Sequence, residues 1–566
     1  MLIQGAAEYL APYVPLDLEE IAARLKRPEK PEQGEAVFPC RELAQRLGQS
    51  PEQTASDLAM RMRQLSGEVR VEASGPDLHL YLNPHVWSIR ILEKALQPDF
   101  GSSRLGEGTR VVIDLSSPNI AKPFGVGHLR STLIGGALAQ LYRFSGYEVI
   151  TVNHLGDWGT HFGKLIAAFK RWGVMERLQQ DPVRESLRLY VNFHEAVDEE
   201  PELAEEAREW YRKLEKGDAE AESLRTYFVE ASLHEFDRVY ERLGVTFDHV
   251  MGESFYKDRI VEVVSRLKDK GLLEELDGRT VVRLDHLGLP PCPILKADGT
   301  TEYSLRDLAA ALYRKEELGA DRLLYVVGIE QSTHFRQVFA VLSELDPGLA
   351  ERCEHVAFGQ MKFQGRQTSI RRGQVIFLND VLDEAVAKAE RIVAGSNPDA
   401  LLHRQSAEAL GIGSIVFSDL KQERTEEIEF SLDDVLRIDG ETGLHMQYTY
   451  AKAMGLLETG TRMRSQAELS AQPDPSALSG RLAWECLKRL NGFPDAVQVA
   501  LQMNEPSLLA AYLLRLARQF NRFYQHETII GTDPEQTQAR LLLTAGVASV
   551  LKQGLELLGI RAVAKL

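Results

Sequence analysis

Cysteine is scarce in this sequence of 566 residues, and the four cysteines stand far apart, at positions 40, 292, 353 and 486. No C-x-x-C pair occurs, so neither a zinc site nor a disulfide framework is expected, and the spacing is typical of a protein from the reducing cytoplasm. Long apolar runs are also missing: the longest, near Leu541 to Val550, is well short of the roughly 18 residues that cross a membrane. The N-terminus lacks the basic start of a secretory signal. These absences predict a cytoplasmic protein without a membrane span.

Glycine and proline, with 43 and 23 residues, are too few for a collagen-like or low-complexity chain. Hydrophobic residues make up 44% and charged residues 26%, the ordinary balance of a globular protein. At about 150 residues per domain, the length predicts roughly three or four domains.

Basic residues are outnumbered by acidic ones, 66 to 83, and the formal net charge of −17 by itself argues against a nucleic-acid partner. The distribution weakens that argument. Residues 196–223 contain 11 acidic and 4 basic residues, whereas residues 507–566 contain 7 basic and 4 acidic ones. Because much of the acidic excess lies in one solvated, helix-like segment, charge neither excludes nor supports a polyanionic partner.

The pattern of the chain changes at glycine-rich residues 101–108, which mark a flexible joint after a small N-terminal domain. A β-rich run at residues 111–115 is followed by a loop, an amphipathic helix and a second strand at 149–152. This βαβ unit predicts a parallel sheet, and residues 322–327 are predicted to be a further buried strand. From about residue 382 onward, helical spacing dominates and predicts an all-α domain.

Residues 117–130 (SPNIAKPFGVGHLR) are the first candidate for chemistry. A glycine-flanked turn after a strand brings backbone N–H groups to a helix start, where unpaired amides and the helix dipole favour anions. His128 can donate to a phosphoryl oxygen, and Lys122 can supply a positive charge. A tight turn with a surface histidine is the alternative. The patterns G-x-G-x-x-G and G-x-x-x-x-G-K-[ST] are absent, so the dinucleotide and P-loop interpretations lose their main support.

Tyr303 and Asp307 are a second candidate, because they stand four residues apart in a helical stretch and share one face. A carboxylate there can bind a planar guanidinium through two hydrogen bonds, which an ammonium cannot reproduce. Taken alone, the pair is equally an ordinary pair on a helix surface.

In combination these segments resemble class I aminoacyl-tRNA synthetases, specifically the arginyl-tRNA synthetase family. The similarity is collinear over nearly the whole chain and is carried by SSPNIAKPFGVGHLRST, NHLGDWGTHFGKL, ADGTTEYSLRDLAAALY, YVVGIEQSTHFRQ, QYTYAK and the terminal LELLGI. The resemblance implies that arginine and ATP form arginyl-adenylate, and that arginine then moves to the 3′ end of tRNA-Arg. It also implies Mg²⁺ with the ATP and no zinc.

The resemblance implies an α/β catalytic domain with a Rossmann-like parallel sheet, a small α+β N-terminal domain and an all-α C-terminal domain. The expected division is 1–105 for a domain that meets the tRNA elbow, 106–385 for the catalytic domain with an inserted helical segment at about 170–290, 386–435 for linker and stem-contact helices, and 436–566 for an anticodon-binding domain.

Two signature elements of the family are altered here. Gly127 and His128 match the second half of its "HIGH" element, but Gly125 replaces the first histidine, which removes one phosphate donor. Losing one preorganised donor can cost on the order of 10²–10³ in rate unless a backbone amide replaces it. In the "KMSK" loop both lysine positions differ, the first being Gln367 and the second Arg371 or Arg372.

Family members that lack this loop lysine have a lysine just before the HIGH element, and Lys122 matches it. We expect Lys122 to stabilise the pentavalent α-phosphate. The resemblance then implies two sets of residues: a catalytic set of Lys122, His128, Arg371 and Arg372, and an ATP-binding set of Gly125, Gly127, His128 and Ser369.

By the same matching, arginine is expected to bind at Asn119, His154, Tyr303, Asp307 and Gln331, and tRNA at Gln447, Tyr448 and Lys452. An aromatic side chain such as Tyr448 can stack on a base, and Lys452 can meet a phosphate. Tyr448 as a core residue is the alternative. Arg515, Arg518 and Arg522 recur at helical spacing and form either a phosphate stripe or an ordinary solvated face.

The leading hypothesis is a working enzyme that uses L-arginine, ATP and tRNA-Arg, acts as a monomer, and binds neither DNA nor a membrane. One alternative is a tRNA-binding or regulatory paralogue with weakened catalysis, which the missing loop lysines favour. Another is an inhibitor-resistant isoform.

Overall fold

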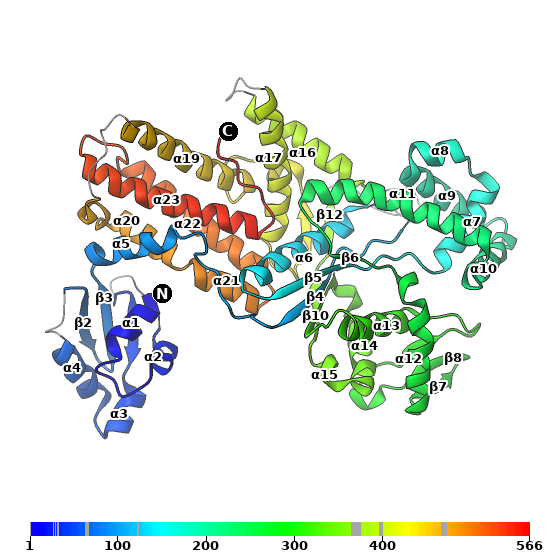
Figure 1. Cartoon of the computed structure of the whole chain (residues 1–566), viewed down its shortest axis with the longest axis horizontal. Helices are drawn as coiled ribbons and strands as arrows, with labels where there is room; N and C mark the ends of the chain where they lie inside the picture. The colour runs from blue at the N-terminus through cyan, green and yellow to red at the C-terminus, as the bar shows by residue number, and fades with distance from the viewer. Residues whose placement is uncertain are drawn as a thin grey trace.

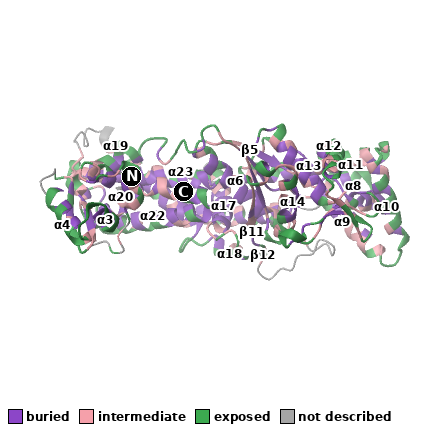
Figure 2. Cartoon of the chain, turned by 90° about the horizontal axis from the view of Figure 1, so that it is seen from below, coloured by how far each residue is buried: buried purple, intermediate pink, exposed green. Residues whose placement is uncertain are grey.

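The computed structural model describes residues 2–26, 28, 30, 33–62, 67–120, 124–363, 375–394, 400–465 and 473–566. The molecule is elongated and flat, with the N-terminal domain at one end, a parallel sheet near the centre and a group of helices at the other end (Figures 1 and 2). No helix within the described residues is both long and apolar enough to cross a membrane.

An antiparallel sheet of three strands, in the order β1-β3-β2, forms the N-terminal domain together with four helices. Its elements are α1 (Leu2–Leu10), α2 (Leu18–Arg24), β1 (Ala36–Pro39), α3 (Arg41–Leu47), α4 (Pro51–Met62), β2 (Val69–Ser74) and β3 (Asp77–Leu82). The next helix, α5 (Pro84–Ala95), packs instead against helices from the C-terminal end of the chain (Figure 1).

The central sheet has five parallel strands in the order β11-β10-β4-β5-β6. They are β4 (Arg110–Asp114), β5 (Glu148–Asn153), β6 (His249–Val250), β10 (Arg322–Gly328) and β11 (Cys353–Phe358). Helix α6 (Val126–Phe144) connects β4 to β5, so the predicted βαβ unit and the buried strand near residue 325 are confirmed. Short apolar runs such as Val111 to Ile113 form these strands because a covered parallel sheet buries both faces.

The prediction of one inserted helical segment at about 170–290 is wrong in its second half. The uninterrupted run of helices ends at Leu243 and consists of α7 (Thr160–Trp172), α8 (Met175–Gln180), α9 (Pro182–Ala196), α10 (Glu202–Glu215) and α11 (Ala219–Leu243). It then returns to the parallel sheet as β6, whose two residues are too few to show a strand pattern. Next come η2 (Glu253–Tyr256), α12 (Lys257–Asp269) and an antiparallel sheet of β7 (Leu273–Leu276), β8 (Arg279–Val282) and β9 (Cys292–Leu295).

The last part of the catalytic region surrounds β10 and β11. Its elements are α13 (Tyr303–Glu316), η4 (Ile329–Gln331), α14 (Ser332–Leu345), α15 (Pro347–Ala350) and β12 (Met361–Phe363). Strand β12 pairs in parallel with β13 (Ile428–Phe430), which lies beyond α16 (Leu378–Val393) and α17 (Ala400–Leu420) and before α18 (Leu432–Val435).

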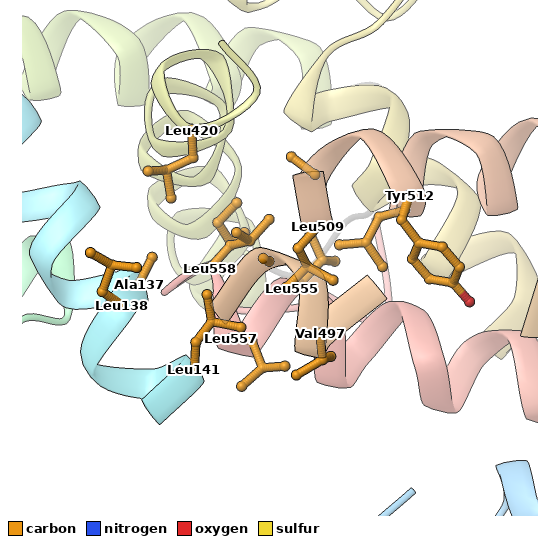
Figure 3. Close-up of a cluster of buried hydrophobic side chains, with 14 of the residues drawn as sticks. Ala137, Leu138, Leu141, Leu420, Val497, Leu509, Tyr512, Leu555, Leu557 and Leu558 are labelled. Carbon is orange, nitrogen blue, oxygen red and sulfur yellow. The ribbon is translucent and has the colours of Figure 1, made fainter. Parts of the chain in front are cut away.

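The C-terminal part is helical, as predicted. It consists of α19 (Gly443–Ser465), η6 (Pro475–Leu478), α20 (Arg481–Asn491), α21 (Phe493–Gln502), α22 (Pro506–His526) and α23 (Pro534–Leu557). Figure 3 shows how it meets the catalytic region: Leu138 and Leu141 of α6 lie beside Leu557 and Leu558, and Val497 and Leu509 continue the same apolar contact. Helix α6 therefore has its C-terminal half buried against these helices.

A buried ion pair adds a polar contact between α6 and α17. Arg130 Nε lies 2.8 Å from Asp419 Oδ1, and the two side chains are 1% and 0% exposed. Arg130 also donates to the carbonyl oxygens of Gly359 at 2.6 Å and Glu426 at 2.9 Å. One side chain thus joins α6 to α17 and to the segments that enter β12 and β13.

Candidate active site

The carboxyl ends of the five parallel strands meet at one edge of the sheet. The chain runs from β4 through α6 to β5 on one side, while β10 lies on the other side of β4. Strand connections therefore diverge at β4, and in open α/β sheets the crevice at such a point is where ligands bind. The first predicted motif, residues 117–130, begins shortly after β4 and ends within α6.

Two serines at the start of this loop adopt a left-handed backbone conformation, with φ of 68° at Ser116 and 48° at Ser117. Residues other than glycine rarely do so, and such strain clusters at functional sites. Hydrogen bonds hold the conformation: Ser116 N–H donates to Ser131 Oγ at 2.8 Å, and Ser117 Oγ donates to Asp114 Oδ1 at 2.6 Å. The loop is thereby fixed to both α6 and the end of β4.

Asn119 is placed by a close approach to the loop after β5. It forms a parallel β-bridge with Gly156, and Gly156 N–H donates to the carbonyl oxygen of Pro118 at 3.0 Å. A Cβ atom at position 156 would lie 2.5 Å from Asn119 Oδ1, so any residue larger than glycine would displace the Asn119 side chain. The segments that contain Asn119 and His154 are thus held side by side.

The N-terminus of α6 provides the predicted anion site. Gly125 is its N-cap residue, the first turn contains no acidic side chain, and Gly127 is exposed with open space beside it. His128 is half-buried, with its ring centroid 5.4 Å from that of Phe124. Gly125 forms an antiparallel bridge with Phe377, which brings the start of α16 to this helix end. Free amides and a helix dipole at an open terminus can bind phosphate.

Five residues of the predicted ATP site and its signature loop lie outside the described residues. They are Lys122, Gln367, Ser369, Arg371 and Arg372.

Asp307, in the second turn of α13, faces the sheet edge between two imidazoles. His334 Nε2 lies 2.6 Å from Asp307 Oδ2, and His154 Nε2 lies 3.8 Å from Asp307 Oδ1. Burial opposes the charged carboxylate, but the hydrogen bond from His334 and the neighbouring positive charges outweigh it and lower the pKa of Asp307. Burial lowers the pKa of His154, which favours its neutral form. These shifts favour a charged Asp307 beside a neutral His154.

Tyr303 and Gln331 lie at the rim of the site rather than inside it. Tyr303, one helical turn before Asp307, is 61% exposed, and the guanidinium carbon of Arg306 lies 4.7 Å from the centre of its ring. Gln331 is exposed at the end of η4, directly after β10. The structure thus brings Asp307 and His154 together, and leaves Tyr303 and Gln331 accessible to a ligand.

Asp157 belongs to the framework of the site. Its carboxylate accepts hydrogen bonds from Ser254 N–H at 2.9 Å and from Arg225 Nη1 at 3.2 Å. A Cβ atom at Gly252 would lie 2.3 Å from Asp157 Cγ. Asp157 therefore joins the loops after β5 and β6 to helix α11.

Sequence reasoning missed Glu253, Arg306 and His334. Glu253 Oε2 lies 3.2 Å from Arg306 Nε, and their side chains are 11% and 3% exposed. Burial raises the pKa of Glu253 to about 7, although Arg306 opposes the shift. Nothing in the sequence marks Glu253. His334 stands three residues after Gln331 in a segment already recognised, so helical spacing could have indicated it.

The prediction that Gln447 binds tRNA is wrong. Its side chain is fully buried, Nε2 donates to the carbonyl oxygen of Arg561 at 2.8 Å, and Oε1 accepts from Val563 N–H at 2.9 Å. Both ends of the amide are used to hold the C-terminal segment, so Gln447 is not available to RNA. The helical pattern gave no sign that this polar position faces inward.

Tyr448 is half-buried and packs against an apolar cluster formed by Ala389, Val393, Ala407, Leu410 and Leu444. Lys452 is exposed, donates to Asn521 Oδ1 at 3.0 Å, and lies 4.6 Å from the centre of the Tyr524 ring. The face formed by α19 and α22 thus presents Lys452 and Tyr524. Arg515, Arg518 and Arg522 are also exposed on α22.

Comparison with protein-family models matches residues 91–432 to "tRNA synthetases class I (R), catalytic domain" and residues 446–566 to "DALR anticodon binding domain". The arginine–tRNA ligase of Clostridium perfringens is 42% identical over 563 residues, covering 99% of each chain. That of Levilactobacillus brevis is 44% identical over 549 residues, covering 97% of this chain and 96% of the relative.

Solved structures agree with these sequence matches. The arginyl-tRNA synthetase of Thermus thermophilus superposes with a TM-score of 0.79 at 25% identity, covering 100% of this chain and 99% of that one. The enzyme of Plasmodium falciparum has the same fold, with a TM-score of 0.76 at 23% identity, covering 100% and 98%.

Proposed function

This chain belongs to the class I arginyl-tRNA synthetases, and from that premise we propose which of its residues carry each part of the reaction. The chain is an arginine–tRNA ligase: it activates L-arginine with ATP and transfers it to the 3′ end of tRNA-Arg. In the first step the arginine carboxylate attacks the α-phosphorus and pyrophosphate leaves. In the second, a terminal ribose hydroxyl of the tRNA attacks the arginyl carbonyl carbon and AMP leaves. Neither the comparisons nor the described residues favour a paralogue with weakened catalysis.

The arginine pocket rests on one observation: the half-buried carboxylate of Asp307 at the carboxyl edge of the parallel sheet, with the imidazole of His154 3.8 Å away. Burial lowers the pKa of His154, and in its neutral form His154 does not neutralise Asp307, so the carboxylate can accept two N–H groups of one guanidinium. Asn119, Tyr303 and Gln331 complete the proposed pocket, since they border the same edge and retain accessible polar groups.

ATP is proposed to lie over the N-terminus of α6, with its phosphates against Gly125, Gly127 and His128. Donors aimed at developing negative charge are the usual source of catalysis in such a site. Mg²⁺ is proposed to enter with the triphosphate, whose oxygens are the hard ligands that it prefers. Lys122 remains the proposed partner of the α-phosphate, and Ser369, Arg371 and Arg372 the proposed partners of the remaining phosphates.

The tRNA is proposed to run along the molecule, with its elbow at residues 1–105, its stem at 386–435 and its anticodon at 436–566. The name of the family model for residues 446–566 supports the last assignment. Lys452 and Tyr448 stay in the proposed interface, and Tyr524 offers a more exposed ring for stacking on a base. We also propose that the chain acts as a monomer.

Steady-state charging of tRNA with labelled arginine tests the pocket. Asp307→Asn preserves shape but removes the charge that a guanidinium would meet. Two charge-assisted hydrogen bonds contribute about 1.5–3 kcal/mol each, so we expect kcat/KM for arginine to fall at least about 10²-fold. Asp285→Asn, at an exposed carboxylate, is the matched control. Wild-type kcat/KM in Asp307→Asn would contradict the pocket.

A further inference from the structure

The two oxygens of the Asp307 carboxylate meet different surroundings. Oδ2 accepts a hydrogen bond from His334 Nε2 at 2.6 Å, whereas His154 Nε2 stands 3.8 Å from Oδ1, too far for a hydrogen bond. Within the described residues neither ring nitrogen of His154 has a hydrogen-bond partner. Only one of the two imidazoles therefore fixes the carboxylate, and Oδ1 stays open.

The neighbouring guanidinium of Arg306 does not occupy Asp307 Oδ1. Arg306, the residue before Asp307 on α13, is directed elsewhere: Nη1 donates to Thr301 Oγ1 at 2.9 Å, and Nε faces Glu253 at 3.2 Å. His334 itself is held in the first turn of α14, where its ring meets the ring of Phe335 at 5.3 Å between centroids. The donor is thus anchored on a rigid helix rather than on a loop.

We propose that His334 is a positioning residue for arginine specificity, which rests on the proposed role of Asp307. A carboxylate offers about four lone-pair sites, and the single bond from His334 uses one of them. That bond stops the carboxylate from rotating and sets its plane, so that the remaining sites on both oxygens face the pocket. A planar guanidinium requires this fixed plane because it binds through two parallel hydrogen bonds.

Arginine and ornithine should differ in how strongly their binding depends on the His334 hydrogen bond. An ammonium group is a compact charge with rotatable donors, and it can follow a rotating carboxylate. Loss of the His334 bond should therefore weaken arginine binding more than ornithine binding. A residue that merely supported the fold would weaken both alike, or would lower stability.

The test uses the full-length protein and two variants. His334→Phe keeps an aromatic side chain without a donor, and His334→Gln restores an N–H donor at similar reach. We measure kcat and KM for arginine and ATP in tRNA charging, Kd values of L-arginine and L-ornithine by calorimetry, and thermal midpoints. For His334→Phe we expect KM and Kd for arginine to rise about 10-fold, with the ATP KM within about two-fold. His334→Gln should recover most of the loss.

Unchanged arginine KM in a folded His334→Phe variant would overturn the proposal, as would equal loss of arginine and ornithine binding. If His334→Phe folds poorly, His334→Asn provides the same comparison, because its amide is too short to reach Asp307. Failure of His334→Gln to recover arginine binding while folded would also overturn it. Asp307→Asn distinguishes the proposed arginine pocket from the proposed role of His334. If Asp307→Asn loses charging while His334→Phe keeps the wild-type arginine KM, the pocket stands and only the role of His334 is rejected.

Discussion

Replacing Asp419 with asparagine should destabilise the whole enzyme, because it breaks the ion pair that joins α6 to α17. Arg130 and Asp419 are 1% and 0% exposed and 2.8 Å apart. Burial raises the pKa of Asp419, and Arg130 acts against that shift. In Asp419→Asn the guanidinium keeps its bonds to the carbonyl oxygens of Gly359 and Glu426 but loses its counter-charge.

The magnitude follows from the burial of the pair. Removing one partner of a fully buried ion pair costs about 3–5 kcal/mol, because the other charge stays buried without compensation. At about 2–4 °C per kcal/mol for domains of this size, the thermal midpoint should fall by roughly 6–20 °C. Replacing both residues with apolar ones, in Arg130→Met with Asp419→Leu, removes both buried charges but also removes the donor to the carbonyl oxygens of Gly359 and Glu426, so it should recover only part of that loss.

Differential scanning calorimetry at pH 7 measures these shifts. The matched control is Asp439→Asn, which breaks a pair of similar length, 3.0 Å, whose side chains are 59% and 78% exposed. That variant should leave the midpoint nearly unchanged, because solvent screens an exposed ion pair. An unchanged midpoint for Asp419→Asn, or a double variant less stable than the single one, would refute the reasoning.

Three further predictions concern the site and the RNA face. Gly156→Ala places a methyl group 2.5 Å from Asn119 Oδ1, so the arginine KM in charging should rise several-fold; an unchanged KM would mean that Asn119 does not contact arginine. Burial raises the pKa of Glu253 to about 7, so the folded protein favours the protonated side chain. The stabilisation by this protonated form is complete below the pKa of the unfolded chain and is lost as the pH rises through 7. The free energy of unfolding should therefore fall by about 1 kcal/mol from pH 6 to pH 8 relative to Glu253→Gln, and parallel pH profiles would reject the shift. Lys452→Ala should raise the tRNA KM a few-fold and reduce the slope of log tRNA affinity against log salt concentration by about one. An unchanged slope would show that Lys452 does not contact a phosphate of the tRNA.

Much of the fold could be predicted because local patterns determine it. The β-rich run at residues 111–115, the amphipathic helix after it and the second strand at 149–152 correctly predicted a βαβ unit and its parallel sheet. Strand β6 could not be predicted, since two residues have no periodicity and are placed only by pairing with β5.

The contacts within the site could not be predicted as well from the sequence, because they join residues that are far apart in the chain. Asp307 and His334 are 27 positions apart on different helices, and only packing brings them to 2.6 Å. Gln447 illustrates the reverse: a polar residue in a recognised motif turned out to anchor the C-terminal segment, because both ends of its amide find backbone partners in the interior.

Arginylation of tRNA by the purified chain, with labelled arginine and Mg·ATP, tests the proposed reaction itself. We predict clear charging that depends on both ATP and tRNA and is lost in Asp307→Asn. Absence of arginylation by a folded protein that still binds tRNA would contradict it.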